Sequence, residues 1–157
     1  MSLLSWLEGL PVSVWVAESD WGYPLLLSAH SMGMAIVVGL LLVLDLRVFG
    51  FAAGIPIAAL DRLMPLAWGG FGINLLSGSL LFASTATRLA GNWAFLVKMA
   101  CVVLGGLTTF WLWHQVRGNN MSRAKGVALL SAALWLSAIT FGRLIAYVMD
   151  HAILHGQ

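Results

Sequence analysis

The fold is decided by residues 21–50, WGYPLLLSAHSMGMAIVVGLLLVLDLRVFG. Between Asp20 and Asp45 this stretch holds 24 residues without a formal charge. At about 1.5 Å per residue, a helix of that length crosses a hydrocarbon layer of about 30 Å. One imidazole, His30, lies inside it, where a polar side chain is costly against lipid and tolerable against neighbouring helices. The stretch is therefore predicted to be a transmembrane helix with one buried histidine.

The composition extends this prediction to the whole chain. Of 157 residues, 61% are hydrophobic and 9% are charged, with a mean hydropathy of +0.93, whereas about a quarter of a soluble domain is charged. The single cysteine, Cys101, can form no intramolecular disulfide. The basic residues lie mainly at the ends of apolar runs, which is typical of topology signals and not of a nucleic-acid surface. The main partner is expected to be a lipid bilayer, and no nucleic acid is expected to bind.

The apolar runs predict an all-α integral membrane protein, a four-transmembrane-helix up-down bundle with a short N-terminal interfacial helix. Residues 1–20 form the interfacial segment and residues 21–157 the membrane domain, with spans predicted at 23–49, 65–88, 92–117 and 125–153. The connection before the second span contains four helix breakers, Gly50, Gly54, Pro56 and Pro65.

The first two spans each carry small or polar residues at a spacing of four, which favours close helix contact. These stripes are Ser31, Ala35 and Gly39 in the first span, and Gly70, Asn74 and Gly78 in the second. Packing is the expected role of the first stripe. The second is also expected to offer hydrogen bonds to neighbouring helices.

The distribution of positive charge predicts the orientation. Two loops, between spans one and two and between spans three and four, hold most of the basic residues: Arg47, Arg62, Arg117, Arg123 and Lys125. On the other side only Arg88 lies outside the apolar runs. By the positive-inside rule both termini face away from the cytoplasm, which in the inner membrane of a bacterium means the periplasm.

Counting from the predicted periplasmic ends places three basic side chains at one depth. His30, Lys98 and Arg143 each lie about 10 Å below that surface, on three different spans. Together they would repel one another and lose hydration unless an anion, a cofactor or carbonyl groups compensated them. Alternatively, Lys98 and Arg143 extend to the headgroups and His30 donates to a carbonyl of the next helix.

A b-type haem fits this set of residues. His30 would supply an axial nitrogen, Gly33 would leave room for the macrocycle, and Lys98 and Arg143 would neutralise the propionates. Tyr147, on the helix face of Arg143, completes the candidate cofactor-binding residues.

The second axial ligand is less well defined. His151 lies about 12 Å shallower than His30, and His114 lies near the cytoplasmic face. A five-coordinate haem or a tilted last helix would be required. A quinone headgroup or a small anion could use the same basic layer without an axial ligand.

Copper is the alternative metal. His151 and His155 are one helical turn apart near the C-terminus, beside Asp150, and could bind one ion at the periplasmic surface. The methionines form no cluster suited to a thioether copper path, because Met32 and Met34 are two residues apart and point in different directions.

No stand-alone enzyme is expected, because the chain contains no nucleophile elbow, P-loop, dinucleotide glycine fingerprint or HExxH motif. The function predicted first is a haem-binding protein that passes electrons to or from a partner. The alternatives are copper transport or homeostasis, and a non-catalytic accessory subunit of a larger membrane complex.

Four short motifs also carry a resemblance to a known family. They are HSMGMA at 30–35, DLR at 45–47, NWAFLVK at 92–98 and GRLIAY at 142–147. With the surrounding spans, these motifs make nearly the whole chain resemble the DUF6644 family of bacterial four-span membrane proteins. The chain is more distantly similar to the CopD-like membrane domains of copper resistance. The resemblance implies a bacterial inner-membrane location and an association with copper or haem handling and a periplasmic redox or metal-binding partner.

Overall fold

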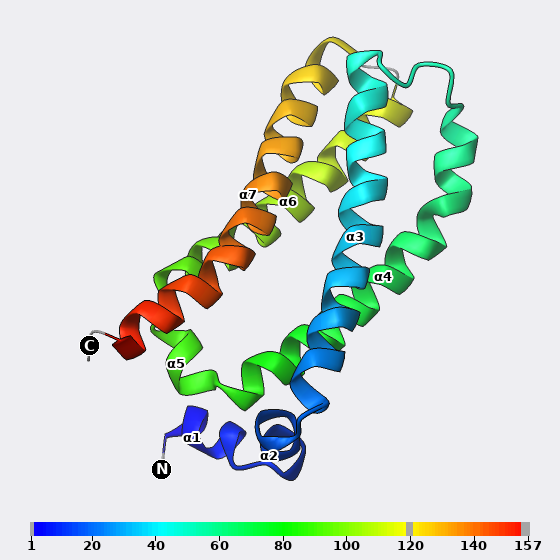
Figure 1. Ribbon diagram of the computed structural model, residues 1–157. Helices are drawn as coiled ribbons and strands as arrows, with labels where there is room; N and C mark the ends of the chain where they lie inside the picture. Colours follow the sequence, from blue (N-terminus) through cyan, green and yellow to red (C-terminus); the bar gives the residue numbers. More distant parts are fainter. Residues whose placement is uncertain (1, 119–120, 155–157) are drawn as a thin grey trace. The chain divides into compact units, whose positions relative to one another are not determined.

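The structure is a computed structural model that describes the backbone of residues 2–118 and 121–154 and the side chains of residues 2–118 and 124–148. These residues form helices and no strand (Figure 1). The helices are α1 (Leu3–Glu8), α2 (Pro11–Glu18), α3 (Gly22–Phe49), α4 (Ile57–Ser84), α5 (Ala86–Ala90), α6 (Trp93–Arg117) and α7 (Met121–Leu154). The predicted all-α fold with four membrane-spanning helices is confirmed.

Four helices are long and apolar enough to cross a membrane: α3, α4, α6 and the part of α7 from Ala124 to Val148. Each has at least 25 residues, which corresponds to about 37 Å or more and exceeds the hydrocarbon thickness. Large apolar side chains such as Leu76 and Phe110 are about two-thirds exposed. That exposure is unfavourable in water and favourable against lipid, so the protein is a multi-pass membrane protein.

The second spanning helix begins earlier than predicted, at Ile57, and Pro65 lies inside it. The ring of Pro65 removes the hydrogen bond that its N–H would donate to the carbonyl of Asp61. The helix nevertheless continues, because its first turn is held by packing of the buried Leu60. The interpretation of Pro65 as a helix breaker was wrong.

The N-terminal segment consists of the two short helices α1 and α2. The carboxylate of Glu8, which ends α1, accepts hydrogen bonds from the backbone N–H of Thr87 at 2.8 Å and from its hydroxyl at 2.7 Å. These two bonds, the hydroxyl bond first, hold the pKa of Glu8 below its ordinary value. Thr85 precedes α5 without a side-chain cap, so Glu8 supplies the missing acceptor at this helix start.

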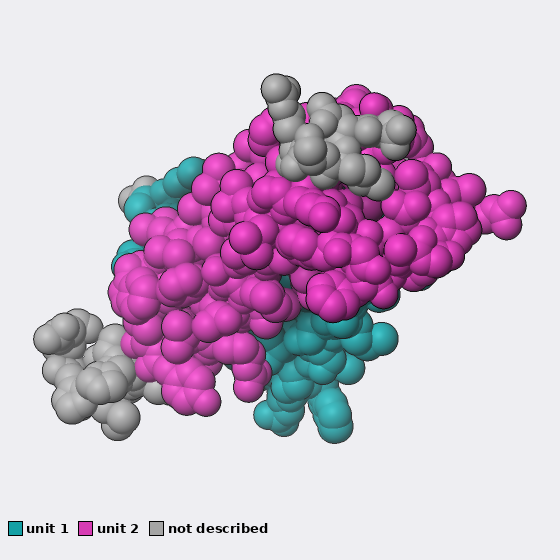
Figure 2. Space-filling model, turned by 90° about the horizontal axis from the view of Figure 1, so that it is seen from above, with its two compact units in different colours: residues 1–37, 64–91 teal, residues 38–63, 92–157 magenta. Residues whose placement is uncertain are grey.

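The chain divides into two compact units (Figure 2). Unit 1 comprises Met1–Val37 and Met64–Gly91, and unit 2 comprises Val38–Leu63 and Asn92–Gln157. The helices α3 and α4 therefore contribute residues to both units. The two units are described separately below.

In unit 1 the backbones of α3 and α4 approach closely at two glycines. A Cβ atom added to Gly33 would lie 2.8 Å from the carbonyl oxygen of Gly70. One added to Gly70 would lie 2.8 Å from Cγ2 of Ile36. Only glycine fits at these two positions, as in other close crossings of membrane helices.

The predicted packing stripes have different outcomes. On α4 the stripe is confirmed, because its three residues contact α3 side chains: Gly70, Asn74 and Gly78. On α3 the prediction was wrong, because its three residues are exposed: Ser31, Ala35 and Gly39. The face of α3 that packs is set instead by Gly33 and Val37, which are both buried.

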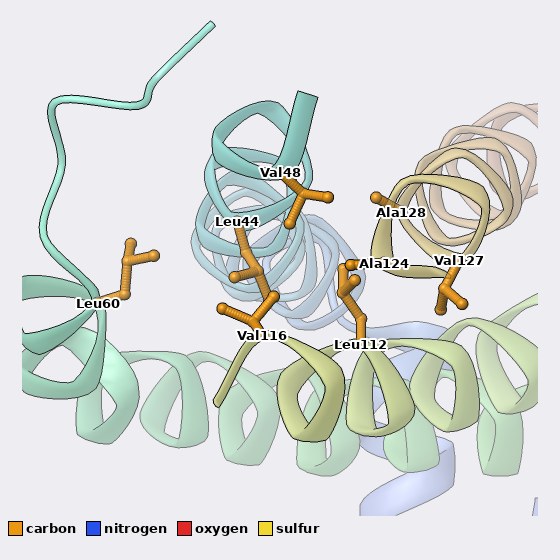
Figure 3. Packing of buried hydrophobic residues seen from close by; sticks show 8 residues of the cluster. All are labelled: Leu44, Val48, Leu60, Leu112, Val116, Ala124, Val127 and Ala128. Atoms are coloured by element: carbon orange, nitrogen blue, oxygen red, sulfur yellow. The ribbon is translucent and has the colours of Figure 1, made fainter. Parts of the chain in front are cut away.

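In unit 2 the helices α6 and α7 pack side by side and share an apolar core with parts of α3 and α4 (Figure 3). The buried cluster consists of Leu44, Val48, Leu60, Leu112, Val116, Ala124, Val127 and Ala128. Leu112 is completely buried. The alanines of α7 allow its backbone to come close to its neighbours at this end of the unit.

Candidate functional site

The ring of His30 is fixed against α4 in unit 1. Its Nδ1 atom lies 3.2 Å from the carbonyl oxygen of Asn74 and 3.1 Å from Oγ of Ser77. A Cβ atom added to Gly78 would lie 3.0 Å from Cε1 of the ring. Because Gly78 has no side chain, the imidazole has room to lie against α4 at this position.

The hydrogen-bond network determines the tautomer of His30. The carbonyl of Asn74 can only accept, and the hydroxyl of Ser77 donates its hydrogen to the carbonyl of Ile73 at 2.6 Å. Both partners of Nδ1 are therefore acceptors, so we assign the proton to Nδ1. In the neutral ring the lone pair is then on Nε2. An imidazole held by Nδ1–H in this way is the usual arrangement of a metal-binding histidine.

The surroundings of His30 differ from the expectation in one respect. Gly33 was expected to leave room for a macrocycle, but backbone atoms of α4 occupy the space beside it. Gly33 therefore serves the helix crossing. The amide of Asn74 donates to the thioether sulfur of Met34 at 3.7 Å, which further ties the two helices together around the histidine.

Lys98 and Arg143 belong to unit 2. The half-buried side chain of Lys98 lies across Gly142 of α7, with its Cε and Nζ atoms 3.6 and 3.7 Å from the position of a Cβ at that glycine. Arg143, the next residue, is exposed. The structure thus brings Lys98 to the stretch of α7 that carries Arg143. Tyr147, one turn further along α7, is 67% exposed.

In the part of the chain that the structure describes, no further histidine takes part in a metal-binding cluster. His114 is exposed and its ring lies edge-on to Phe110, with 4.8 Å between the ring centroids. His155 and the side chain of His151 lie outside the described residues, so the copper site predicted there stays a prediction. Among the described residues, no three His, Cys, Asp or Glu side chains form a group that could hold a metal ion.

The sequence analysis missed a buried acid, Asp45, in the second half of α3. Its side chain is 1% exposed, and neither carboxylate oxygen has a hydrogen-bond partner of ordinary geometry among the described residues. The Ser131 hydroxyl of α7 faces it. An ionisable residue within a membrane span is a functional candidate by default.

A sequence signal for this burial existed. The residues three and four positions away from Asp45 share its helix face, and all four are apolar: Leu41, Leu42, Val48 and Phe49. Arg47, two residues away, is on another face and donates to the carbonyl of Ile55. The acid therefore shares its face with the apolar residues that pack in unit 2.

Three comparisons with known proteins returned no match: no family model, no curated protein and no solved structure is similar to this chain at a significant level.

Proposed function

We propose that this membrane protein binds a b-type haem through Nε2 of His30 and passes electrons to or from a partner protein. The observation that supports the proposal is the hydrogen bonding of Nδ1, which holds the ring against α4 and orients it. Ligating histidines are usually oriented in this way by a carbonyl or another acceptor. When bound, haem supplies a one-electron couple of its iron.

The fit of a haem rests on the axial nitrogen. Gly33 contributes no space for the macrocycle. That Lys98, Arg143 and Tyr147 hold the propionates stays a prediction from the sequence, based on the strong charge-assisted bonds that guanidinium and ammonium groups form with carboxylates. A role for His151 as a second ligand likewise stays a prediction from the sequence.

The proposed location is the inner membrane of a bacterium, with both termini in the periplasm. It is supported by the excess of basic residues in the loops after α3 and after α6. Membership of the DUF6644 family is part of the same proposal and is based on the four motifs quoted above. A periplasmic redox protein is accordingly the proposed partner.

The proposal is tested by measuring haem content in the full-length protein, expressed with a haem supply and purified in mild detergent. We expect haem equimolar with the chain, and its loss in His30→Ala. His114→Ala is the matched control, because His114 is exposed on α6, and we expect unchanged haem content. Equal haem in wild type and His30→Ala would refute the ligand assignment. Absence of haem together with equimolar copper in elemental analysis would replace the proposal by copper binding.

A further inference from the structure

Asp45 is a buried acid that the proposed haem site does not use. Asp45 belongs to unit 2 and lies four residues before the end of α3. Its side chain is one of the largest fully buried side chains among the described residues. An ionised carboxylate removed from water needs a counter-charge or several donors. Neither of its oxygens makes a hydrogen bond of ordinary geometry with a described residue.

A chain of polar groups on α6 and α7 leads toward this carboxylate. Nε1 of Trp135 lies 3.0 Å from Oγ1 of Thr109, and that oxygen lies 3.3 Å from Oγ of Ser131. The completely buried Ser131 hydroxyl in turn interacts with the Asp45 carboxyl, without a hydrogen bond of ordinary geometry. All four residues lie in unit 2, so the chain belongs to one compact part of the molecule.

The direction is fixed at the first bond of this chain, whereas either hydroxyl can be the donor between Thr109 and Ser131. The indole N–H of Trp135 can only donate, so the Thr109 oxygen accepts from it. In the arrangement in which Thr109 donates its hydrogen to Ser131, the hydrogen of Ser131 can point at Asp45. In this arrangement each donor polarises the next one toward the carboxylate.

The charged and titratable side chains that the structure describes on the helices around Asp45 have other contacts or are exposed. On α3, Arg47 donates to the carbonyl of Ile55. On α6, Arg117 forms an ion pair of 2.6 Å with Asp61 of α4. Two further groups, His114 of α6 and Lys125 of α7, are exposed. Within the described residues, Asp61 and Arg117 form the one ion pair, so no described cation is paired with Asp45.

We propose that Asp45 is a reversible proton-binding site in the buried interior of unit 2, served by the hydroxyls of Ser131 and Thr109. In the reaction, one carboxylate oxygen takes up a proton and forms an O–H bond, and no other bond changes. A metal cation fits less well, because it needs several oxygen ligands and the described residues hold no group of three His, Cys, Asp or Glu side chains that could bind one. The inference is independent of the haem, since His30 is in unit 1.

The test is infrared difference spectroscopy of the full-length protein in lipid nanodiscs as a function of pH. We expect a carboxylic-acid C=O band that grows as the pH falls and that is missing in Asp45→Asn. In Ser131→Ala the band should persist to higher pH, because the variant removes a donor that favours the anion. Thr140→Ala is the matched control, because Thr140 is a hydroxyl of α7 that bonds to its own helix at Leu136. The pH at which its C=O band reaches half of its full intensity, the titration midpoint, should equal that of wild type.

Three results would overturn the proposal. The first is a spectrum of the folded protein without any pH-dependent carboxyl band that Asp45→Asn removes. The second is an identical midpoint in wild type and Ser131→Ala. The third is a midpoint that falls when sodium replaces a bulky organic cation at constant ionic strength, which would assign a sodium site instead. Because Ser131→Ala retains the acid, the test remains decisive even if Asp45→Asn fails to fold.

Discussion

The Nδ1 atom of His30 and the Oγ atom of Ser77 lie 3.1 Å apart, although the two residues are 47 positions apart in the chain. This contact joins α3 to α4 and orients the imidazole. We therefore expect Ser77→Ala to lower the affinity for haem by about 10- to 100-fold, the usual effect of removing a group that orients a metal ligand. Haem titration monitored by absorbance measures the change. Ser79→Ala, an exposed serine of the same helix, should bind haem as wild type does; equal affinity in both variants would contradict the role of Ser77.

The crossing of α3 and α4 should tolerate no side chain at Gly33. In Gly33→Ala the added Cβ would lie 2.8 Å from the carbonyl oxygen of Gly70, so backbone must move. We expect a loss of about 1–3 kcal/mol in the free energy of unfolding, as in other overpacked sites. Unfolding in mixed detergent micelles measures it. Gly72→Ala is the control, because no neighbouring atom lies within 4 Å of the added Cβ; a comparable loss there would show that helix crossing is not the cause.

The contact between α1 and α5 should depend on pH. The pKa of Glu8 is lowered in the folded protein by its bonds to Thr87, so the folded state gains stability from this carboxylate above the pKa it has in the unfolded chain. That gain is lost as the pH falls through the lower, folded pKa. The protection of the Thr87 amide, measured as its hydrogen exchange relative to the intrinsic rate at each pH, should therefore fall at acidic pH.

The Glu8→Gln variant provides the comparison for this pH effect. We expect low protection of the Thr87 amide at neutral pH and little further loss of protection on acidification, because the charged acceptor is absent. Glu18→Gln removes an exposed carboxylate of α2 and should retain the wild-type profile. A pH-dependent profile that persists in Glu8→Gln would assign the effect to another group.

The ion pair between Asp61 and Arg117 should contribute little to stability. Its side chains are 39% and 57% exposed, and exposed pairs contribute about 0–1 kcal/mol. The guanidinium of Arg117 also lies over the ring of Trp113, 5.1 Å from the centroid, and keeps this contact in Asp61→Asn. We expect Asp61→Asn to lower the free energy of unfolding by at most about 1 kcal/mol, and the difference to shrink at high salt. A larger, salt-independent loss would show that the pair is effectively buried.

The sequence was sufficient to predict the four spanning helices, because apolar runs of this length have few alternatives in a protein. The start of α6 was also close to its predicted position, since Asn92 caps it by accepting from the N–H of Ala94 at 2.9 Å. The start of α4 was not predicted. Pro65 is a strong local signal against a helix, and the packing of Leu60 that outweighs it depends on residues far away in the chain.

The candidate site was predicted less completely than the spans. The depth of His30 along its span marked it as unusual, but the partners that fix its ring, Asn74 and Ser77, depend on how α3 is rotated against α4. The small-residue spacing in α3 gave the wrong face. Asp45 was passed over because it was treated as the charged end of an apolar run, although its face of the helix is apolar.

The absorption spectrum of the isolated full-length protein, oxidised and then reduced, tests the central claim most directly. We predict a Soret band after haem-replete expression and a shift of that band on reduction, both lost in His30→Ala. A folded wild-type protein without a Soret band would contradict the account.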